Sequence, residues 1–465
     1  MWRAFVFTLI ATCALTACNH TATRTMSLPS LPADRIAALN VELASIVNDP
    51  QRPLASLSAL VIKHGEVVYQ SQFGHRYIDN ANPANNVAAN ADTLYRIASI
   101  SKLVTTIAVM QLVEAGTLSL DADVSQYLGW TLRNPHFPDV PITLKSLLTH
   151  TSSLRDDAGY YWEYTTKIRD VLVPGGRLYG TGAMWAKNAA PGQYFQYANL
   201  PWGVIGTVME RATGERFDSL MQRLLFRPLG VRGGFHPADF SPHDLADIAT
   251  LYRKRTEING HEIWDPSPAT GPWTAQVDDY RTGAPVPRAR PDYVIGSNGT
   301  AFGPQGACRL SAIGLAKLMR MLMGGGEVDG VRVLKPATVA QMLATQWRFD
   351  HARPNGGTSE FGDAHQLFNA WGLGNQHFLD VSGREHGDRL VDGGGFIGVG
   401  HLGDAWGLTS AFVFDPKTSD GVIFLVGGVG ANPEGSRGNY SAFYRYEERI
   451  LTALIRQALG RSALR

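Results

Sequence analysis

The amino-acid sequence predicts an α/β (α+β) protein built on an antiparallel sheet with helices on both faces. Near the amino terminus, a helix-forming segment is followed by a hairpin and then by a long apolar helix. Near the carboxyl terminus, two β-rich runs joined by a short turn precede another helix. We therefore expect the two ends of the chain to share one sheet.

The amino-terminal elements follow from hydrophobic spacing. Apolar residues recur every three or four positions over 33–48, which predicts the first helix. The runs 58–62 and 67–69 are rich in β-forming residues, and Gly65 lies between them, so they predict a hairpin. Residues 103–112 are mostly apolar and contain neither Gly nor Pro, which indicates a buried helix.

The rest of the chain carries further elements. Helix-forming segments occur at 144–148, 200–213, 312–323 and 444–459, and β-rich runs at 410–414 and 421–426. Residues 232–300 are rich in Pro, Gly, His and Asp and show no regular spacing. An irregular segment of that length is typical of a lid, a binding surface or an insertion.

The irregular segment contains a group that invites a metal-site interpretation, namely His261, Glu262 and Asp265. A zinc hydrolase would place two histidines around a glutamate as H-E-x-x-H, and that pattern occurs nowhere in the chain. No further ligand follows at a recognisable distance. We expect neither a metal nor an organic cofactor.

Composition limits the class of protein. The chain has 465 residues, of which 44% are hydrophobic, enough to bury a large core in one domain over 33–465. Its 42 basic and 41 acidic residues nearly cancel, which argues against nucleic acid as a partner. Of three cysteines, only Cys308 lies beyond residue 18, so no intramolecular disulfide is expected. Cys308 fits a small buried residue.

Residues 1–17 have the features of a secretory signal, because Arg3 precedes an apolar stretch too short to span a bilayer. Leu-Thr-Ala-Cys at 15–18 resembles the lipobox of bacterial lipoproteins, which implies lipidation of Cys18. Residues 18–32 are polar with two prolines, as expected of a tether. The expected location is the cell envelope, lipid-anchored to the outer membrane and facing the periplasm. The alternatives are a plain secretory signal cut near Ala17 or a short membrane anchor.

The pattern Ser-x-x-Lys, at Ser99 and Lys102, is the first candidate for chemistry. Residues three apart lie on one face of a helix, so the two side chains would face each other. A lysine amine beside a serine can take the hydroxyl proton once burial or nearby charge lowers the pKa of the amine. Of the nine lysines, only Lys102 has a serine three residues earlier.

A second pattern, Tyr-Ala-Asn, places Tyr197 two residues before Asn199. A buried tyrosine near an ammonium group can act as general base to a serine and as general acid to a leaving group. The asparagine amide could hydrogen-bond both the substrate and Lys102. The alternative for this tripeptide by itself is a loop whose tyrosine hydroxyl faces water.

A third pattern, His-Leu-Gly-Asp, contains His401, Gly403 and Asp404 and runs toward the last strands. A strand with a bare glycine lets a substrate backbone lie close against it. A free backbone N–H at this point can complete an oxyanion hole. For His401 alone, the alternative is an ordinary core or surface histidine.

In this order, the three patterns resemble the serine hydrolases of the β-lactamase and D-alanyl-D-alanine carboxypeptidase superfamily, especially class C β-lactamases, D-aminopeptidases and related esterases. Leu-Leu-Thr-His-Thr-Ser at 147–152 is similar to the family's LLTHTSG, with Ser153 where glycine is usual. The resemblance covers roughly residues 55–230 and 300–460. It implies a β-lactamase-like fold with a mostly helical region inserted at about 116–300, and a cleft between the two parts.

The resemblance also implies a role for each candidate residue. Ser99 would be acylated, Lys102 would activate it, and Tyr197 would shuttle the proton. The backbone N–H groups of Ser99 and Asp404 would form the oxyanion hole, and water would hydrolyse the acyl-enzyme. The substrate would be bound by the remaining candidates, Asn199, His401, Gly403 and Asp404.

One departure from the family bears on the substrate. The family's β-lactamases usually have Lys-Thr-Gly where this chain has His401 and Gly403, and a permanently charged lysine suits a substrate carboxylate better than histidine does. We expect hydrolysis of amides or esters, such as D-amino acid or peptidoglycan-type peptides. A broad esterase or weak β-lactamase is one alternative. A slow-turnover penicillin-binding envelope protein is another, of a different class.

Three further patterns fit known chemistry only in part. Gly-Gly-Gly-Phe-Ile-Gly at 393–398 matches a dinucleotide fingerprint, but more glycine follows where a helix would have to begin. Ser152 and Ser153 have no lysine three residues later and are typical of a turn. Lys417 begins a Lys-Thr-Ser sequence in a predicted turn that lacks the glycine. None of these is expected to take part in catalysis.

Overall fold

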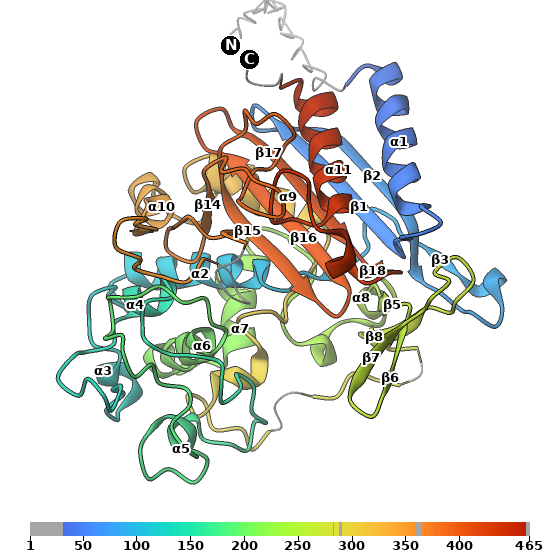
Figure 1. Cartoon of the computed structure of the whole chain (residues 1–465). Helices are drawn as coiled ribbons and strands as arrows, with labels where there is room; N and C mark the ends of the chain where they lie inside the picture. Colours follow the sequence, from blue (N-terminus) through green and yellow to red (C-terminus); the bar gives the residue numbers. More distant parts are fainter. Residues whose placement is uncertain (1–30, 282, 288–290, 359–364, 462–465) are drawn as a thin grey trace, which may run out of the picture.

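The computed structural model describes residues 31–281, 283–287, 291–358 and 365–461. Within them, the largest sheet has nine antiparallel strands in the order β12-β13-β14-β15-β16-β17-β1-β2-β3 (Figure 1). These strands are β12 (Trp347–Arg348), β13 (Ala370–Trp371), β14 (Gln376–Phe378), β15 (Gly398–Ala405), β16 (Leu408–Asp415), β17 (Asp420–Val426), β1 (Ser56–Lys63), β2 (Glu66–Tyr77) and β3 (Val87–Ala88). The two ends of the chain share one sheet, as predicted.

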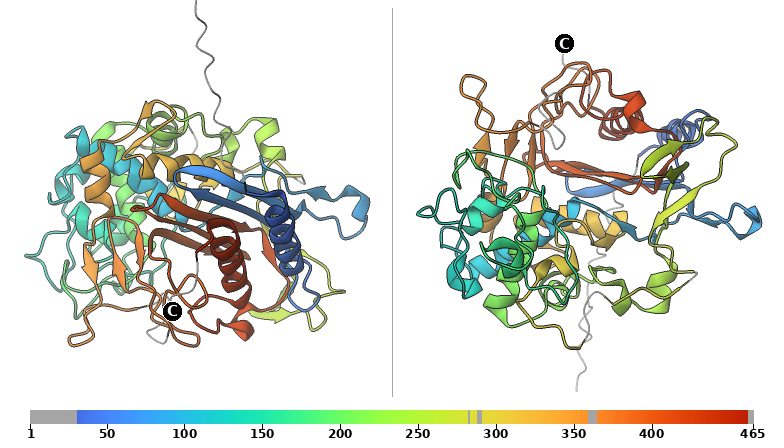
Figure 2. Two further views of the ribbon diagram at one scale, coloured as in Figure 1. Left: turned by 90° about the horizontal axis from the view of Figure 1, so that it is seen from above. Right: turned by 60° about the horizontal axis from the view of Figure 1, so that its bottom comes forward.

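Helices cover both faces of this sheet (Figure 2). One face carries α1 (Ala33–Val47) and α11 (Arg445–Ala453), and α11 continues into the π-helical segment η6 (Leu454–Leu459). The opposite face carries α2 (Ile100–Glu114) and α9 (Ala312–Met323). The predicted antiparallel sheet with helices on both faces is therefore confirmed, and each of these helices overlaps a segment that the sequence predicts to be helical.

Burial on both faces explains why the central strands read as continuous apolar runs. In β1, Leu57 and Val61 belong to the core beneath α1 and α11, whereas Leu60 and Ile62 belong to the core that contains α2 and α9. Successive side chains of a strand point to opposite faces, so one strand supplies both cores. The predicted hairpin turns at His64 and Gly65, whose φ angles are 52° and 83°.

A second group of helices gathers beyond α2, on the side away from α1 and α11 (Figures 1 and 2). It comprises α3 (Ser125–Leu128), α4 (Leu144–Leu148), α5 (Ile168–Leu172), α6 (Leu200–Thr213) and α7 (Phe217–Met221). Outside this group, α10 (Pro336–Leu343) lies against the turn between β13 and β14, and α8 (Pro242–Ala246) lies on the opposite side of the molecule (Figure 1). All of α2 except Gln111, Val113 and Glu114 is buried, because the helix lies between this group and the sheet. That position accounts for the lack of a polar face in its sequence.

The prediction of an irregular segment at 232–300 within a mostly helical insertion was wrong in part. The segment contains the strands β5 (Leu251–Arg253), β6 (Arg255–Ile258), β7 (His261–Trp264) and β8 (Thr274–Val277), and β5 pairs with both β8 and β18 (Gly428–Val429). Asn259 and Gly260 join β6 to β7 with φ angles of 52° and 78°, which is the backbone of a two-residue hairpin turn. This Asn-Gly signal was present in the sequence.

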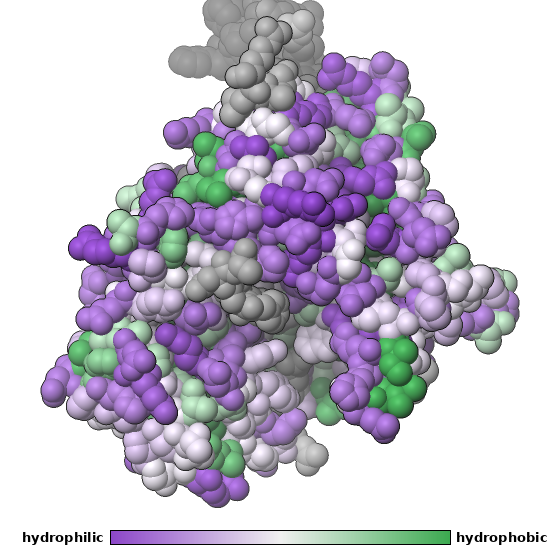
Figure 3. Space-filling view, in the orientation of Figure 1, coloured by the Kyte–Doolittle hydropathy of each residue, from purple (hydrophilic) through white to green (hydrophobic). Residues whose placement is uncertain are grey.

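One side of that hairpin carries an exposed apolar patch. Figure 3 shows the patch over β6 and β7, where Ile258 and Ile263 are about half exposed.

The predicted signal at 1–17, the lipidation site Cys18 and nearly all of the tether at 18–32 lie outside the described residues. In the part that is described, none of the helices combines the length and the apolar character needed to cross a bilayer.

Candidate active site

Ser99 stands at a sharp turn between a short strand and α2. The strand β4 (Tyr95–Arg96) pairs with β9 (Arg309–Leu310), and Ser99 caps the start of α2. Ala98, between them, has φ +44°, a left-handed conformation that an alanine adopts only when its surroundings impose it. The turn presents Ser99 to two adjoining cavities.

Strand β15 is part of what holds this turn in place. A Cβ atom on Gly403 would lie 2.6 Å from the carbonyl oxygen of Ile97 and 3.2 Å from the Cβ of Ala98. The sequence analysis assigned the bare glycine to substrate approach. The structure shows that it admits the protein's own backbone, so that β15 lies directly against the turn that carries Ser99.

Lys102 lies one turn along α2 from Ser99 and is completely buried. Its Nζ donates hydrogen bonds to Ser99 Oγ at 2.9 Å, to Asn199 Oδ1 at 2.7 Å and to the carbonyl oxygen of Gln305 at 3.2 Å. The ring of Tyr197 lies with its centroid 4.8 Å from the same nitrogen. The structure thus brings the first and second sequence patterns together around one amine.

Asn199 is fixed by an aspartate that the sequence patterns did not single out. The Asp156 carboxylate accepts hydrogen bonds from Asn199 Nδ2 at 2.9 Å and from the backbone N–H groups of Asn199 and Leu200. This leaves the carbonyl oxygen of the asparagine facing Lys102. No spacing rule could have revealed Asp156, because it lies 43 residues from its partner.

An aromatic cluster surrounds Tyr197. The His150 ring stacks on it at 4.4 Å, Phe368 stacks at 5.1 Å, and Trp371 meets it edge-on at 5.8 Å. Burial lowers the pKa of His150 well below its usual value, with Lys102 contributing. His150 Nδ1 accepts the backbone N–H of Ala198, which fits a neutral ring. The histidine of the 147–152 sequence therefore positions the Tyr-Ala-Asn segment.

His401 lies on β15 and is also buried. Desolvation, together with the charge of Lys102, lowers the pKa of His401 to about 3. Its Nδ1 lies 2.6 Å from the carbonyl oxygen of Leu402. The sequence analysis expected a histidine partly charged near neutral pH. The structure corrects this, because a buried ring beside an ammonium group stays neutral.

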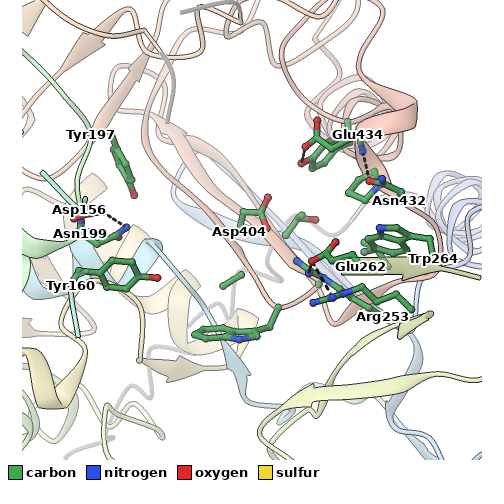
Figure 4. Close-up of a pocket in the computed structure, with 18 of the residues that line it drawn as sticks. Asp156, Tyr160, Tyr197, Asn199, Arg253, Glu262, Trp264, Asp404, Asn432 and Glu434 are labelled. Atoms are coloured by element: carbon green, nitrogen blue, oxygen red, sulfur yellow. Dashed lines mark hydrogen bonds and ion pairs between the residues drawn. The ribbon is translucent and has the colours of Figure 1, made fainter. Parts of the chain in front are cut away.

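Asp404 lies where three cavities meet. Asp404 lines a cavity of about 1000 Å³ together with Tyr197 and Asn199. It also lines a cavity of about 540 Å³ with Ser99 and Asn199, and a smaller cavity with Ser99 and Tyr197. Figure 4 shows Asp404 between the tyrosine side of the cleft and the side formed by Arg253 and Glu262. All seven predicted site residues beyond Cys18 therefore border or support one cleft.

Ser101, two residues after Ser99, and two of the patterns set aside in the sequence analysis have structural roles. Ser101 Oγ accepts the backbone N–H of Cys308 inside the core, and burial raises the pKa of that thiol. Ser153 has φ +64°, which explains why glycine suits its position, and its hydroxyl accepts a hydrogen bond from Asn134. The glycine-rich 393–398 segment runs into β15 and opens no helix.

The carboxylates that could bind a metal ion form ion pairs with arginine side chains. Glu262, from the sequence-derived group, pairs with Arg255 at 3.1 Å. Ligand atoms of Asp218, His236 and Asp239 lie within 4.8 Å of one another, but Arg216 donates to Asp218 at 2.6 Å and to Asp239 at 3.0 Å. Because the Arg216 guanidinium pairs with both aspartates, it offsets the carboxylate charge that would attract a cation.

Comparison with known proteins identifies the family of this chain. The sequence model of the β-lactamase family matches residues 41–446. The chain belongs to the β-lactamase family. Solved structures that resemble this family member include a penicillin-binding protein homologue from Pyrococcus abyssi, described as octameric, with a TM-score of 0.59 and 21% identity over 92% of this chain and 78% of that one. Another, from Caulobacter crescentus, has a TM-score of 0.58 and 19% identity over 93% of this chain and 100% of that one. They show a shared β-lactamase-like fold.

Curated relatives match this family member over shorter stretches. The D-alanyl-D-alanine-carboxypeptidase/endopeptidase AmpH of Escherichia coli is 30% identical over 36% of this chain and 43% of its own length. Esterase EstB of Burkholderia gladioli is 32% identical over 41% of this chain and 49% of its own. Penicillin-binding protein 4 of Amycolatopsis lactamdurans is 28% identical over 55% and 58%. The chain thus spans about half the length of these relatives.

Proposed function

We propose that the protein is a serine hydrolase that forms an acyl-enzyme at Ser99. One observation carries the proposal: Ser99 Oγ accepts a hydrogen bond from the buried Lys102 Nζ at 2.9 Å, in a cleft that Tyr197 also lines. A serine hydroxyl is a weak nucleophile unless a base lies within hydrogen-bond reach, and the Lys102 amine becomes such a base once it has lost a proton.

The proposed reaction has two halves. Ser99 Oγ attacks the carbonyl carbon of an amide or ester, its proton passes to the Lys102 and Tyr197 pair, and that pair protonates the departing amine or alcohol. Water then attacks the acyl-enzyme with the same groups acting in reverse. The backbone N–H groups of Ser99 and Asp404 are the proposed donors to the oxyanion.

The proposed substrates are D-amino acid or peptidoglycan-type peptides and related esters. Two observations support this choice. The similar proteins include one named as a D-alanyl-D-alanine carboxypeptidase and one named as an esterase. In addition, the pairing of β15 with β14 ends at Gly400, so the described strands leave 401–405 unpaired on that side for an extended substrate.

We further propose that Cys18 is lipidated and attaches the protein to the outer membrane on its periplasmic side. The Leu-Thr-Ala-Cys sequence at 15–18 supports this proposal. Metabolic labelling with an alkynyl fatty acid tests it. The full-length protein should take up the label, and Cys18→Ala should not. Labelling of the variant would contradict the proposal.

Covalent labelling tests the nucleophile. A fluorescent fluorophosphonate should label the protein, and Ser99→Ala should abolish labelling. Ser101→Ala is the matched control two residues away, since its hydroxyl serves the Cys308 backbone, and most labelling should remain. The reverse pattern would show that the nucleophile is Ser101 and that the proposed assignment to Ser99 is wrong.

Turnover distinguishes the proposed enzyme from its alternatives. The purified protein should hydrolyse members of a panel of D-amino acid amides, short acyl esters and a chromogenic cephalosporin. Hydrolysis restricted to simple esters or the cephalosporin would favour a broad esterase or weak β-lactamase. Permanent labelling by a fluorescent penicillin, with hydrolysis of none of the panel, would favour a slow-turnover penicillin-binding protein.

A further inference from the structure

The carboxylate of Asp404 has no ionic partner in the part of the chain that the structure describes. Its side chain is exposed to the cleft and lines both cavities that Ser99 lines. None of the described residues forms an ion pair or hydrogen bond with it. A carboxylate that faces a cleft and forms no ion pair or hydrogen bond with the protein is a candidate for ligand binding.

The cations nearest this carboxylate are bound to other anions. Arg253 pairs with Glu262 at 3.4 Å, and Arg437 pairs with Glu434 at 2.7 Å. Across the cleft, Arg96 pairs with Asp278 at 2.9 Å. None of these arginines forms an ion pair with Asp404, and the charges of Arg253 and Arg437 only partly offset the effect of burial on its pKa.

The same stretch of strand offers no positive charge. His401, three residues before Asp404, is buried and neutral. Lys102 is completely buried and already donates to three acceptors. A substrate group that reaches Asp404 from Ser99 therefore meets a negative charge.

Aromatic surfaces border the same cavity. Trp406 and Tyr160 line it with Ser99 and Asp404, and their side chains are 43% and 40% exposed. The faces of such rings attract cations, and the Arg96 guanidinium already lies over the Trp406 ring, 4.9 Å from its centroid. A carboxylate next to exposed aromatic rings is a combination that suits an ammonium or guanidinium group.

We infer that Asp404 is a specificity-determining residue, which binds an ammonium or guanidinium group of the substrate and disfavours a carboxylate at the same place. This inference rests on the proposed function, because it concerns the cleft next to Ser99. It narrows the proposed substrates to amides or esters that carry a positive charge near the scissile bond. Substrates with a free carboxylate there would be poor.

The inferred preference should depend on pH. Burial within the cleft raises the pKa of Asp404 to about 6, so the carboxylate is ionised above that pH and neutral below it. The titratable and charged groups that interact with it are Arg253 of β5, Glu434 and Arg437 before α11, and Tyr444, Tyr446 and Glu447 at the start of α11. Burial raises the pKa of Glu447 to about 8, so that group stays largely protonated at and below neutral pH.

Three matched probes test the inference on the full-length protein. They are fluorophosphonates that share a short alkyl linker and end in an ammonium, a methyl or a carboxylate group, and the readout is the ratio of their labelling rate constants. At pH 7 the ammonium probe should label at least about tenfold faster than the methyl probe, with the carboxylate probe slowest. In Asp404→Asn this ratio should fall to within about threefold, and in Asp404→Lys the order should reverse.

The control is Asp157→Asn, which removes an exposed carboxylate that lines the large cavity but neither cavity next to Ser99. Its ratio should match that of the wild type. In the wild type the ratio should also decline as pH falls through about 6, while Asp404→Asn should show no such decline. Equal labelling rates for the three probes would overturn this inference and leave the proposed function intact. A ratio of ammonium to methyl labelling rates that is unchanged in Asp404→Asn would do the same. Labelling by none of the probes would instead overturn the proposed function.

Discussion

Lys102 is the residue on which the proposed chemistry depends. A primary amine with no exposure to water is unusual, and here three acceptors and an aromatic ring offset its desolvation. Removing any of these neighbours changes the surroundings of the amine. The site therefore behaves as a unit, and effects of single substitutions will not add.

Substitution of the two proton-transfer groups should slow acylation. If Lys102 and Tyr197 relay protons, Lys102→Ala and Tyr197→Phe should each reduce the fluorophosphonate labelling rate on the order of 100-fold or more. Tyr197→Phe keeps the ring that packs on His150 and Phe368, so its thermal unfolding should change little. Labelling of both variants at the wild-type rate would exclude the proposed relay.

Asp156 should act as a positioning residue for Asn199. Asp156→Ala removes the acceptor of Asn199 Nδ2 and of two backbone N–H groups, so the amide should rotate away from Lys102. We expect a fall in kcat of about tenfold or more with a smaller change in stability, and partial recovery in Asp156→Glu. A loss of stability without a change in kcat would show that the contact is only structural.

At the scale of elements, the close approach of β15 to the turn before Ser99 is the decisive contact. The residue that allows it is Gly403, and the strand also carries His401 and Asp404. Two segments 300 residues apart in sequence are thereby held in van der Waals contact. Neither α2 nor β15 would present its residues correctly by itself.

Gly403→Ala tests that contact. The new Cβ would lie 2.6 Å from a backbone oxygen of Ile97, so β15 must move away from the turn, at a cost of about 1–3 kcal/mol in stability. Both the midpoint of thermal unfolding and the labelling rate at Ser99 should fall. Gly435→Ala is the control, since a Cβ there meets nothing within 4 Å. Equal behaviour of the two variants would contradict the packing argument.

At the scale of the whole molecule, a buried ion cluster connects the 232–300 segment to the strands beside Ser99. Asp278, at the end of β8, accepts hydrogen bonds from Arg96 of β4 and from Arg309 of β9. All three side chains are buried. The insertion is therefore fastened to the turn that carries Ser99.

Loss of this cluster should destabilise the fold. Asp278→Asn leaves two buried guanidinium groups without their counter-ion, so the free energy of unfolding should fall by about 3–5 kcal/mol. Asp279→Asn, one residue away, removes a charge that is not part of the cluster and keeps an oxygen that can accept the backbone N–H of Arg281, so it should have a small effect. Chemical denaturation measures both. A small effect at Asp278 would mean that the arginines find other partners.

The same carboxylate predicts a dependence on pH. The two arginines hold the pKa of Asp278 well below its usual value, against the opposing effect of burial. A pKa depressed in the folded state adds stability above the unfolded value of about 3.9, and this stability is lost as pH falls below it. The difference in unfolding free energy between the wild type and Asp278→Asn should therefore shrink below about pH 4. A constant difference would contradict the assignment.

Much of this arrangement could be predicted from local pattern. Helical spacing placed α1, α6 and α9, and the Ser-x-x-Lys spacing placed Ser99 and Lys102 on one face, because these features depend on residues close in sequence. The β6–β7 hairpin shows that a local signal can also be overlooked. Its strands are only four residues long, and the many prolines and glycines around them made the whole segment resemble an irregular loop.

The sequence by itself determined the nucleophile candidate, its lysine neighbour and the class of fold. Only the tertiary structure decided that Asp156 fixes Asn199, that His401 is neutral, and that Asp404 lacks a partner in the described part of the chain. Those properties depend on desolvation and on contacts between distant segments. Hydrophobic periodicity constrains which side of an element is buried, but the charge state and partners of a buried group depend on what the folded chain places around it.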